Sequence, residues 1–316
     1  MSDIIMSIEN LTKKFPVSGG KFLTACDNIS FHVRNGETIG IVGESGCGKT
    51  TLLKAIMNMQ LPTSGRIIFH GKDITKLTGE EKRQNYRHIQ MVFQDPTAAF
   101  DPKMRIKDIV CEPLINFDLI SRADVETKAR ELLAQVDLPP DFVHRYPHNM
   151  SGGQRQRVAI ARALALEPEV IACDEATSAL DVSVQDTIVK LLVKLQREKG
   201  ITYIFICHDL ALVSMFSHRI AIMYLGNMME KIDGDKLNQA RHPYTRALLK
   251  AVFSTNQENN QYIEILPGEI PSPLDMPSGC PFRNRCVYCQ DLCTKEKPAF
   301  KELDDNHFVA CHYPID

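Results

Sequence analysis

Residues Gly43–Thr50, which read GESGCGKT, carry the strongest chemical signal in the sequence. They follow an apolar, strand-like segment and precede a segment with helical periodicity. Glycines allow the backbone N–H groups of such a loop to converge on one phosphate, and the helix adds the positive end of its dipole. Lys49 would reach the β- and γ-phosphates, and Thr50 would hold Mg²⁺. The predicted phosphate-binding residues are Gly43, Glu44, Ser45, Gly46, Cys47, Gly48, Lys49, Thr50 and Thr51.

Two carboxylates end the apolar segment VIACDE, Val170–Glu175. A buried strand cannot keep both inside, so we expect Asp174 and Glu175 at its carboxyl end, where α/β sheets bind their ligands. Asp174 is suited to bind Mg²⁺ through water, and Glu175 to orient and polarise an attacking water. Alone, the segment is equally typical of a strand that runs into an acidic turn. The phosphate loop upstream favours the hydrolytic interpretation.

The segment Ser151-Gly152-Gly153-Gln154 precedes a helical pattern. A serine at this position is expected to cap the helix, which leaves N–H groups at its positive end for an anion. Because the chain already has a phosphate loop, this second anion site favours contact with a nucleotide on a partner chain. The alternative for these few residues by themselves is an ordinary capped helix.

Apolar, strand-sized segments alternate with helical ones over about the first 255 residues, which predicts an α/β fold with a mostly parallel sheet. We expect an ATPase-like domain at 1–255 with a helical insert at about 96–166. A small, irregular, cysteine-rich appendage is predicted at 256–316, after the polar linker STNQENNQ. The segment RIAIMYLGNMMEKI reads as a strand pair with a turn at Gly226-Asn227.

Composition narrows the class of protein. A net charge of −2 over 316 residues gives no global electrostatic case for nucleic acid. No apolar run approaches the roughly 18 residues that span a bilayer, and the first residues lack the architecture of a signal peptide. We therefore expect a cytoplasmic chain, in which ten cysteines favour metal binding or burial over disulfides.

Half of the cysteines lie near the chain end, at Cys280, Cys286, Cys289, Cys293 and Cys311. Four thiolates can hold either a [4Fe–4S] cluster or Zn²⁺. The pair Cys286-x-x-Cys289 is a weak zinc-like signal without a second pair of that spacing. A proline-rich tail with buried free thiols is the alternative, and a metal-sensing or redox-sensing module is a further one.

The order and spacing of these motifs resemble the nucleotide-binding subunit of ABC transporters, a P-loop NTPase fold with a helical subdomain. The resemblance covers about the first 255 residues. It implies that Phe15 stacks on adenine, that Gln94 senses Mg²⁺ and the membrane partner, and that His208 contacts the γ-phosphate. It also implies a loop that crosses a dimer, formed by Ser178, Ala179, Leu180 and Asp181.

Three further segments are similar to the dipeptide/oligopeptide/nickel branch of ABC importers: MVFQDPTAAFDPKM, RHPYTRALLKAV and the tail with CPFRNRC. That branch implies a second nucleotide-binding subunit, favoured to be a paralogue, together with two transmembrane permease subunits and an extracytoplasmic substrate-binding protein. It places the chain on the cytoplasmic face of the membrane. It also implies a [4Fe–4S] cluster, with Cys289 as an extra thiol and the ligands Cys280, Cys286, Cys293 and Cys311.

The expected activity is ATP hydrolysis that powers peptide import, with each ATP sandwiched between the phosphate loop of one subunit and the Ser151–Gln154 turn of the other. Import of nickel chelates or oligosaccharides by the same machine is the alternative, and a non-transport ABC ATPase is a more remote one. The catalytic residues are expected to be Lys49, Gln94, Glu175 and His208, and the Mg²⁺ ligands Thr50, Gln94 and Asp174.

Overall fold

The computed structural model describes residues 4–254 and 271–315. The chain divides into two compact units, of which unit 1 comprises residues 1–76 and 207–316 and unit 2 comprises residues 77–206. The predicted boundary between residues 255 and 256, and nearly all of the predicted linker, lie outside the described residues. The boundary therefore stays a prediction.

Unit 1 contains an antiparallel sheet with the strand order β2-β1-β4-β5. Buried and less buried residues alternate along β1, and its Leu11 is fully buried beside Ile29 of β2. Such alternation is typical of antiparallel strands with one face on the core. The prediction of a mostly parallel sheet did not anticipate this second sheet. Its strands are β1 (Ile4–Pro16), β2 (Phe22–Arg34), β4 (Ser64–Phe69) and β5 (Lys72–Asp73).

A second set of strands in unit 1 follows the order β11-β12-β10-β9-β3. Strands β3 and β9 are parallel and fully buried, whereas β10, β12 and β11 continue in antiparallel fashion. The last two strands belong to the chain end, so the tail completes this part of the sheet. The bounds are β3 (Thr38–Val42), β9 (Arg219–Tyr224), β10 (Asn227–Asp233), β11 (Lys301–Asp304) and β12 (His307–Val309).

The predicted strand pair is present as β9 and β10, but its turn lies at Leu225-Gly226 and not at Gly226-Asn227. Both turn residues have positive φ, 44° and 75°. A two-residue hairpin of this kind favours glycine at the second turn position. Asn227 is the first residue of β10, and its side-chain amide donates to the Leu225 carbonyl at 2.7 Å.

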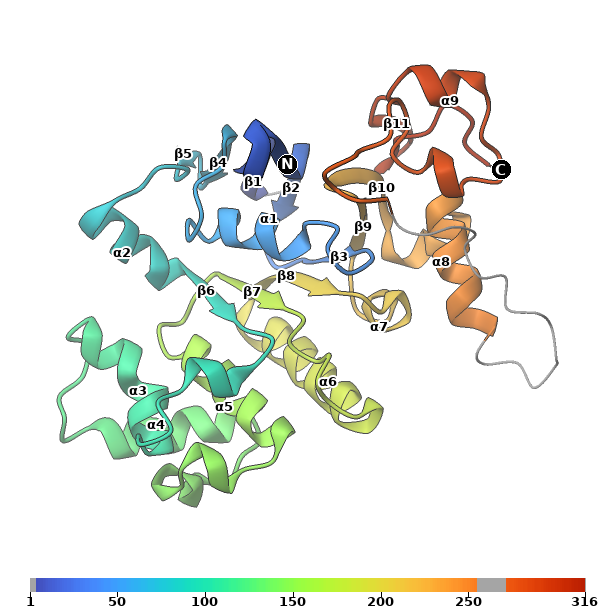
Figure 1. The fold of residues 1–316 in the computed structure, drawn as a ribbon. Helices are drawn as coiled ribbons and strands as arrows, with labels where there is room; N and C mark the ends of the chain where they lie inside the picture. The colour runs from blue at the N-terminus through green and yellow to red at the C-terminus, as the bar shows by residue number, and fades with distance from the viewer. Residues whose placement is uncertain (1–3, 255–270, 316) are drawn as a thin grey trace. The chain divides into compact units, whose positions relative to one another are not determined.

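Among the described residues of unit 1, four segments are α-helical. Helix α1 follows the phosphate loop directly, and α7 and α8 follow the later strands of the chain. The short α9 lies in the tail, where Figure 1 shows the chain end folded beside β10 and α8. The bounds are α1 (Lys49–Ile56), α7 (Leu210–Ser214), α8 (Pro243–Ser254) and α9 (Asp291–Lys295).

Unit 2 contains three parallel strands in the order β8-β7-β6, which confirms the parallel prediction for this part of the chain. Helices α3, α4 and α5 pack against one another, as Figure 1 shows. The strands are β6 (Ile89–Val92), β7 (Val170–Asp174) and β8 (Thr202–Cys207). The helices are α2 (Gly79–His88), α3 (Ile106–Asn116), α4 (Val125–Gln135), α5 (Gly152–Leu164) and α6 (Val182–Lys199).

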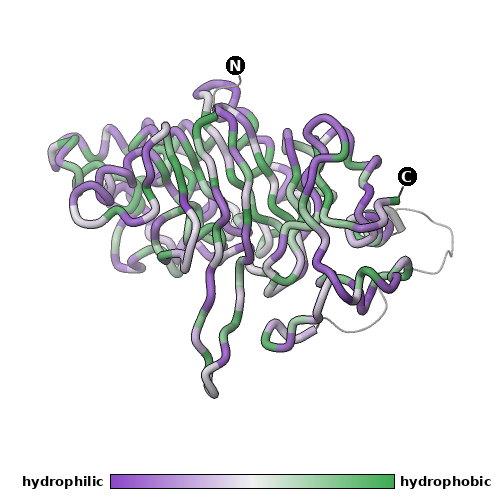
Figure 2. Tube along the Cα trace, turned by 90° about the horizontal axis from the view of Figure 1, so that it is seen from above, coloured by the Kyte–Doolittle hydropathy of each residue, from purple (hydrophilic) through white to green (hydrophobic). Residues whose placement is uncertain are grey.

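Hydrophobic and hydrophilic stretches alternate along the traced chain, as Figure 2 shows. Strands β3, β7 and β8 of the parallel part are buried along their whole length and mostly apolar, as is typical of parallel strands with both faces covered. Within the described residues, every helix is too short or too polar to cross a bilayer.

Candidate functional site

The phosphate loop of unit 1 holds its lysine in place through the loop backbone. The Lys49 ammonium donates to the carbonyl oxygens of Gly43 at 2.7 Å and of Glu44 at 3.0 Å. Lys49 is buried, although it is the first residue of α1. A buried ammonium needs such partners, and a phosphate oxygen can replace them. The loop therefore presents a pre-positioned cation at the positive end of α1.

Two loop glycines are required by close packing. Gly48, the residue before α1, has φ of 105°, and an added Cβ would lie 2.0 Å from the Ala25 carbonyl oxygen. A Cβ on Gly43 would lie 2.2 Å from the Met223 carbonyl oxygen. The loop thus passes directly against the backbones of β2 and β9, where side chains cannot fit.

Unit 2 brings Gln94 together with Glu175 and Ser178, which lie 81 and 84 positions later in the sequence. The Gln94 side-chain amide donates to a carboxylate oxygen of Glu175 at 2.9 Å and to the Ser178 hydroxyl at 3.3 Å. The Ser178 hydroxyl in turn donates to the Glu175 carbonyl at 3.0 Å. The candidate general base is therefore hydrogen-bonded to the predicted glutamine and tied to the loop predicted to cross a dimer.

Glu175 has a left-handed backbone, with φ of 45°. This conformation is uncommon for a residue that has a Cβ and is concentrated at functional sites. Its N–H donates to the Ile206 carbonyl at 3.0 Å, which fixes the turn after β7. The turn separates the buried carboxylate of Asp174, the last residue of β7, from the partly exposed one of Glu175.

The predicted helix cap at Ser151 is confirmed. The Ser151 hydroxyl accepts from the Gln154 N–H at 3.3 Å, and the Gln154 side chain accepts from the Ser151 N–H at 3.0 Å. This reciprocal pair is a capping box. A Cβ on Gly153 would lie 2.5 Å from the Val184 Cγ1, and one on Gly152 would lie 3.2 Å from the Leu180 Cδ2. The start of α5 therefore packs directly against the Ser178–Asp181 loop and the start of α6.

The predicted nucleotide-site residues are divided between the two units. Lys49, Thr50, Phe15 and His208 belong to unit 1, whereas Gln94, Asp174, Glu175 and the Ser151 turn belong to unit 2. Phe15 is a half-buried residue of β1 with the Lys13 ammonium 5.0 Å from its ring centre. His208 is exposed directly after β8. Adenine stacking by Phe15 and γ-phosphate contact by His208 stay predictions.

Four of the five tail cysteines line one cavity in unit 1, together with His242, Phe282 and Tyr313. The fifth, Cys289, does not line it and is exposed. All ten cysteines of the chain are free thiols. The lining cysteines are Cys280, Cys286, Cys293 and Cys311.

Burial raises the pKa of Cys280 to about 12 and that of Cys286 to about 11, and neighbouring thiols act in the same direction. Such thiols stay protonated unless a cation stabilises their thiolates. Their sulfur donors fit the chemistry of an iron–sulfur cluster or zinc. Among residues 4–254 and 271–315, however, no three His, Cys, Asp or Glu side chains are gathered in a metal-binding arrangement.

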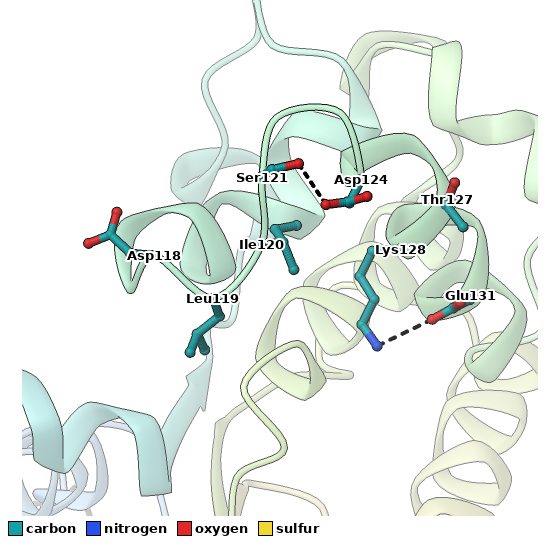
Figure 3. A pocket seen from close by; sticks show the side chains of 8 residues that line it. All are labelled: Asp118, Leu119, Ile120, Ser121, Asp124, Thr127, Lys128 and Glu131. Carbon is teal, nitrogen blue, oxygen red and sulfur yellow. Dashed lines mark hydrogen bonds and ion pairs between the residues drawn. The ribbon is translucent and has the colours of Figure 1, made fainter.

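An open hollow of unit 2 lies between the end of α3 and α4 (Figure 3). Two pairs hold its wall: the Ser121 hydroxyl donates to the Asp124 carboxylate at 2.6 Å, and Lys128 pairs with Glu131 at 3.2 Å. The hollow contains none of the predicted nucleotide or metal residues.

Comparisons with known proteins connect both parts of this description. A family profile described as "ABC transporter" matches residues 26–178, and one described as "Oligopeptide/dipeptide transporter, C-terminal region" matches residues 230–293. The oligopeptide transport ATP-binding protein AppF of Bacillus subtilis is 44% identical over 98% of this chain and 97% of its own. The oligopeptide transport ATP-binding protein OppF of Haemophilus influenzae is 44% identical over the same shares.

Solved structures agree. A dimeric ATP-binding cassette in a post-hydrolysis state with ADP and phosphate is 32% identical, with a TM-score of 0.66 over 72% of this chain and 98% of the other. A cassette from Clostridium perfringens is 29% identical, with a TM-score of 0.67 over 75% of this chain and 91% of the other. These likenesses imply ATPase activity coupled to transport. The chain belongs to the ABC transporter family of ATP-binding subunits, in the group of oligopeptide transport ATP-binding proteins.

Proposed function

We propose that this chain hydrolyses ATP between two nucleotide-binding subunits and thereby powers the import of peptides across the cytoplasmic membrane. The observation that carries the proposal is the hydrogen bond from Gln94 to the Glu175 carboxylate. It fixes a base at the carboxyl end of a parallel strand and connects it to a residue that follows the neighbouring strand β6.

In the proposed reaction, a water oxygen attacks the γ-phosphorus, and the bond to the β–γ bridging oxygen breaks to release ADP. Glu175 orients and polarises the water and accepts the proton that the water loses. Lys49, released from its carbonyl partners, neutralises charge on the transferred phosphoryl group, and His208 donates to a γ-phosphate oxygen. The capped turn at Ser151 would contact the nucleotide of the partner subunit.

Thr50, Gln94 and Asp174 supply the oxygen donors that Mg²⁺ prefers. When bound, the ion would neutralise charge on the β- and γ-phosphates. Asp174 is held at the end of a fully buried strand, which limits its freedom to turn away.

The proposed partners are a second nucleotide-binding subunit, favoured to be a paralogue, two transmembrane permeases and an extracytoplasmic substrate-binding protein. The chain would bind the permeases from the cytoplasmic face of the membrane. Relatives named for peptide or oligopeptide transport support peptides as the substrate class over nickel chelates or oligosaccharides. They also disfavour a non-transport ATPase.

The test is reconstitution with the permeases and the binding protein of the same transport system. We expect ATP hydrolysis in proteoliposomes to rise when the binding protein is loaded with peptide. A complex with Glu175→Gln is the matched control and should bind ATP without that rise. Stimulation by nickel chelates or oligosaccharides, but not by peptides, would overturn the substrate proposal.

We further propose that the tail cysteines bind a [4Fe–4S] cluster, with Zn²⁺ as the alternative metal. The supporting observation is that Cys280, Cys286, Cys293 and Cys311 line one cavity and Cys289 lies outside it. In the described arrangement the thiols are not gathered for a metal, so binding requires their side chains to draw together. The cluster would stabilise a tail that has little core of its own.

Anaerobically purified protein tests this second proposal. Iron, labile sulfide and visible absorbance are expected in the unmodified chain and in Cys289→Ser, and they should be lost in Cys286→Ser. Zinc without sulfide would replace the cluster by the alternative metal. Absence of both metals from the unmodified chain would overturn the proposal.

A further inference from the structure

An ion pair joins the tail to the phosphate loop. Nη1 of Arg285 donates to both carboxylate oxygens of Glu44, at 3.0 Å and 2.8 Å. The two residues are 241 positions apart in the sequence. The Arg285 side chain is 6% exposed and that of Glu44 is 21% exposed. The pair therefore lies largely inside unit 1, where loss of one partner leaves a poorly solvated charge.

Glu44 is held at three points. Its carboxylate accepts from Arg285, and its backbone N–H donates to the Tyr244 hydroxyl at 3.2 Å. Its carbonyl oxygen accepts from the Lys49 ammonium at 3.0 Å. The residue that Arg285 fixes is thus one of the two residues that place the phosphate-binding lysine.

Arg285 is itself held by a rigid setting. Phe282, three residues earlier, is fully buried and makes an edge contact with Tyr224, with ring centres 5.3 Å apart. Its ring also lies 5.2 Å from that of Tyr244. The backbone N–H of Arg285 donates to the Phe282 carbonyl oxygen at 3.0 Å. One aromatic anchor therefore positions both the guanidinium and the tyrosine that contact Glu44.

We propose that Arg285 is a positioning residue for the nucleotide site, which sets the geometry of the phosphate loop through Glu44 and so raises the affinity for ATP. The inference rests on the proposed function, because it takes MgATP as the ligand of that loop. Arg285 reaches the phosphate loop through the Glu44 carboxylate, so we expect it to act through Glu44. The segment from Cys280 to Cys286 would thereby connect the cysteine cavity to nucleotide binding.

The test compares Arg285→Ala, Arg285→Lys and a control in the intact complex. Lys297→Ala is the control, because Lys297 also joins the tail to the body of unit 1, through Asp27 at 2.6 Å, but in an exposed pair that contains no residue of the loop. We expect Arg285→Ala to raise the Kd of MgATP about tenfold, which is about 1.4 kcal/mol, and to change kcat less than about threefold. Arg285→Lys should recover part of the affinity, and Lys297→Ala should stay within about twofold.

A double-mutant cycle with Glu44→Gln separates positioning from general destabilisation. If Arg285 acts through Glu44, the double variant Glu44→Gln/Arg285→Ala should bind MgATP with nearly the same Kd as Glu44→Gln alone. The inference would be overturned if the two substitutions had additive effects on the binding free energy of MgATP. It would also be overturned if Arg285→Ala and Lys297→Ala had the same Kd. If unmodified protein neither binds nor hydrolyses MgATP, the proposed function fails first. If Arg285→Ala does not fold, the comparison of Glu44→Gln with unmodified protein decides, and an unchanged Kd overturns the inference.

Discussion

The nucleotide motifs and the cysteine-rich tail are positioned in different ways. Lys49 is held by residues five and six positions away, and Ser151 by one three positions away. Tail residues are held by distant ones: Arg285 by Glu44, and His307 by Glu230, 77 positions earlier, at 2.7 Å. The phosphate loop and the capped turn therefore carry their geometry locally, whereas the tail acquires much of its geometry from the rest of unit 1.

The largest effect should come from the motif side. Glu175→Gln removes the carboxylate that polarises water and keeps the shape that Gln94 contacts, so ATP binding should persist. We expect kcat to fall by about 1000-fold. Glu169→Gln, which changes the residue directly before β7, is the control. Its kcat in a steady-state ATPase assay should stay within about twofold of that of the unmodified protein. Normal hydrolysis by Glu175→Gln would show that another group is the base.

The next largest effect should come from the tail. Phe282→Ala empties a fully buried aromatic site between Tyr224 and Tyr244, and we expect a loss of about 3 kcal/mol in the free energy of unfolding. Tyr288→Ala, which removes a half-exposed ring of the same tail, should cost less than about 0.5 kcal/mol. Denaturant unfolding measures both. Equal losses would mean that the tail is not anchored through Phe282.

A smaller effect is expected where α5 meets α6. In Gly153→Ala, the added methyl group meets the stiff Val184 side chain at 2.5 Å, and we expect a loss of about 1 kcal/mol in the free energy of unfolding. The double variant Gly153→Ala/Val184→Ala should recover stability, because it frees the space. Failure of this rescue in thermal unfolding would argue that the glycine serves the nucleotide contact alone.

The smallest effect concerns pH. Burial, and next the nearby Arg219 guanidinium, lower the pKa of His32 to about 4, and Nε2 of His32 lies 3.2 Å from Nη1 of Arg219. Lys231 and Arg34 add to this lowering, and Glu37 opposes it. His32 takes up a proton near pH 6.5 in the unfolded chain but only near pH 4 in the folded chain. The free energy of unfolding therefore falls as the pH drops through this window.

The slope should be less than about 0.5 kcal/mol per pH unit, because His32 is only partly buried and solvent screening reduces the effect of the shift. His32→Gln should flatten it in unfolding curves measured at pH 6.5 and pH 4.5. An unchanged slope would mean that His32 is protonated in the folded protein.

Three features were predictable because each has a local cause: the phosphate loop, the capped turn and the two carboxylates at the end of β7. A glycine-rich turn before a helix and a serine before a helical pattern are visible within a few residues. The left-handed backbone at Glu175 and the bond from Gln94 to Glu175 could not be predicted from the residues alone, because they depend on how parallel strands align.

The tail was predictable in composition and not in contacts. Cysteine spacing separated Cys289 from the other four by resemblance, and the cavity agrees with that grouping. Nothing in CPFRNRC indicated that Arg285 would meet Glu44, because that contact depends on how Phe282 packs against Tyr224 and Tyr244, which lie far away in the sequence. Two arginines, Arg283 and Arg285, lie between the candidate ligands Cys280 and Cys286, and the sequence does not distinguish their partners.

Pairing of β12 with β10 also has a consequence for association between molecules. Without the tail, β10 would present a seven-residue edge containing Met228, Met229 and Ile232 to other chains. The tail replaces it with β11, a four-residue strand that reads KELD and is mostly exposed. Short, charged edge strands discourage edge-to-edge pairing. A chain cut before residue 271 would thus expose β10 to pairing with other chains and would tend to aggregate. The tail prevents this by covering the edge of the sheet.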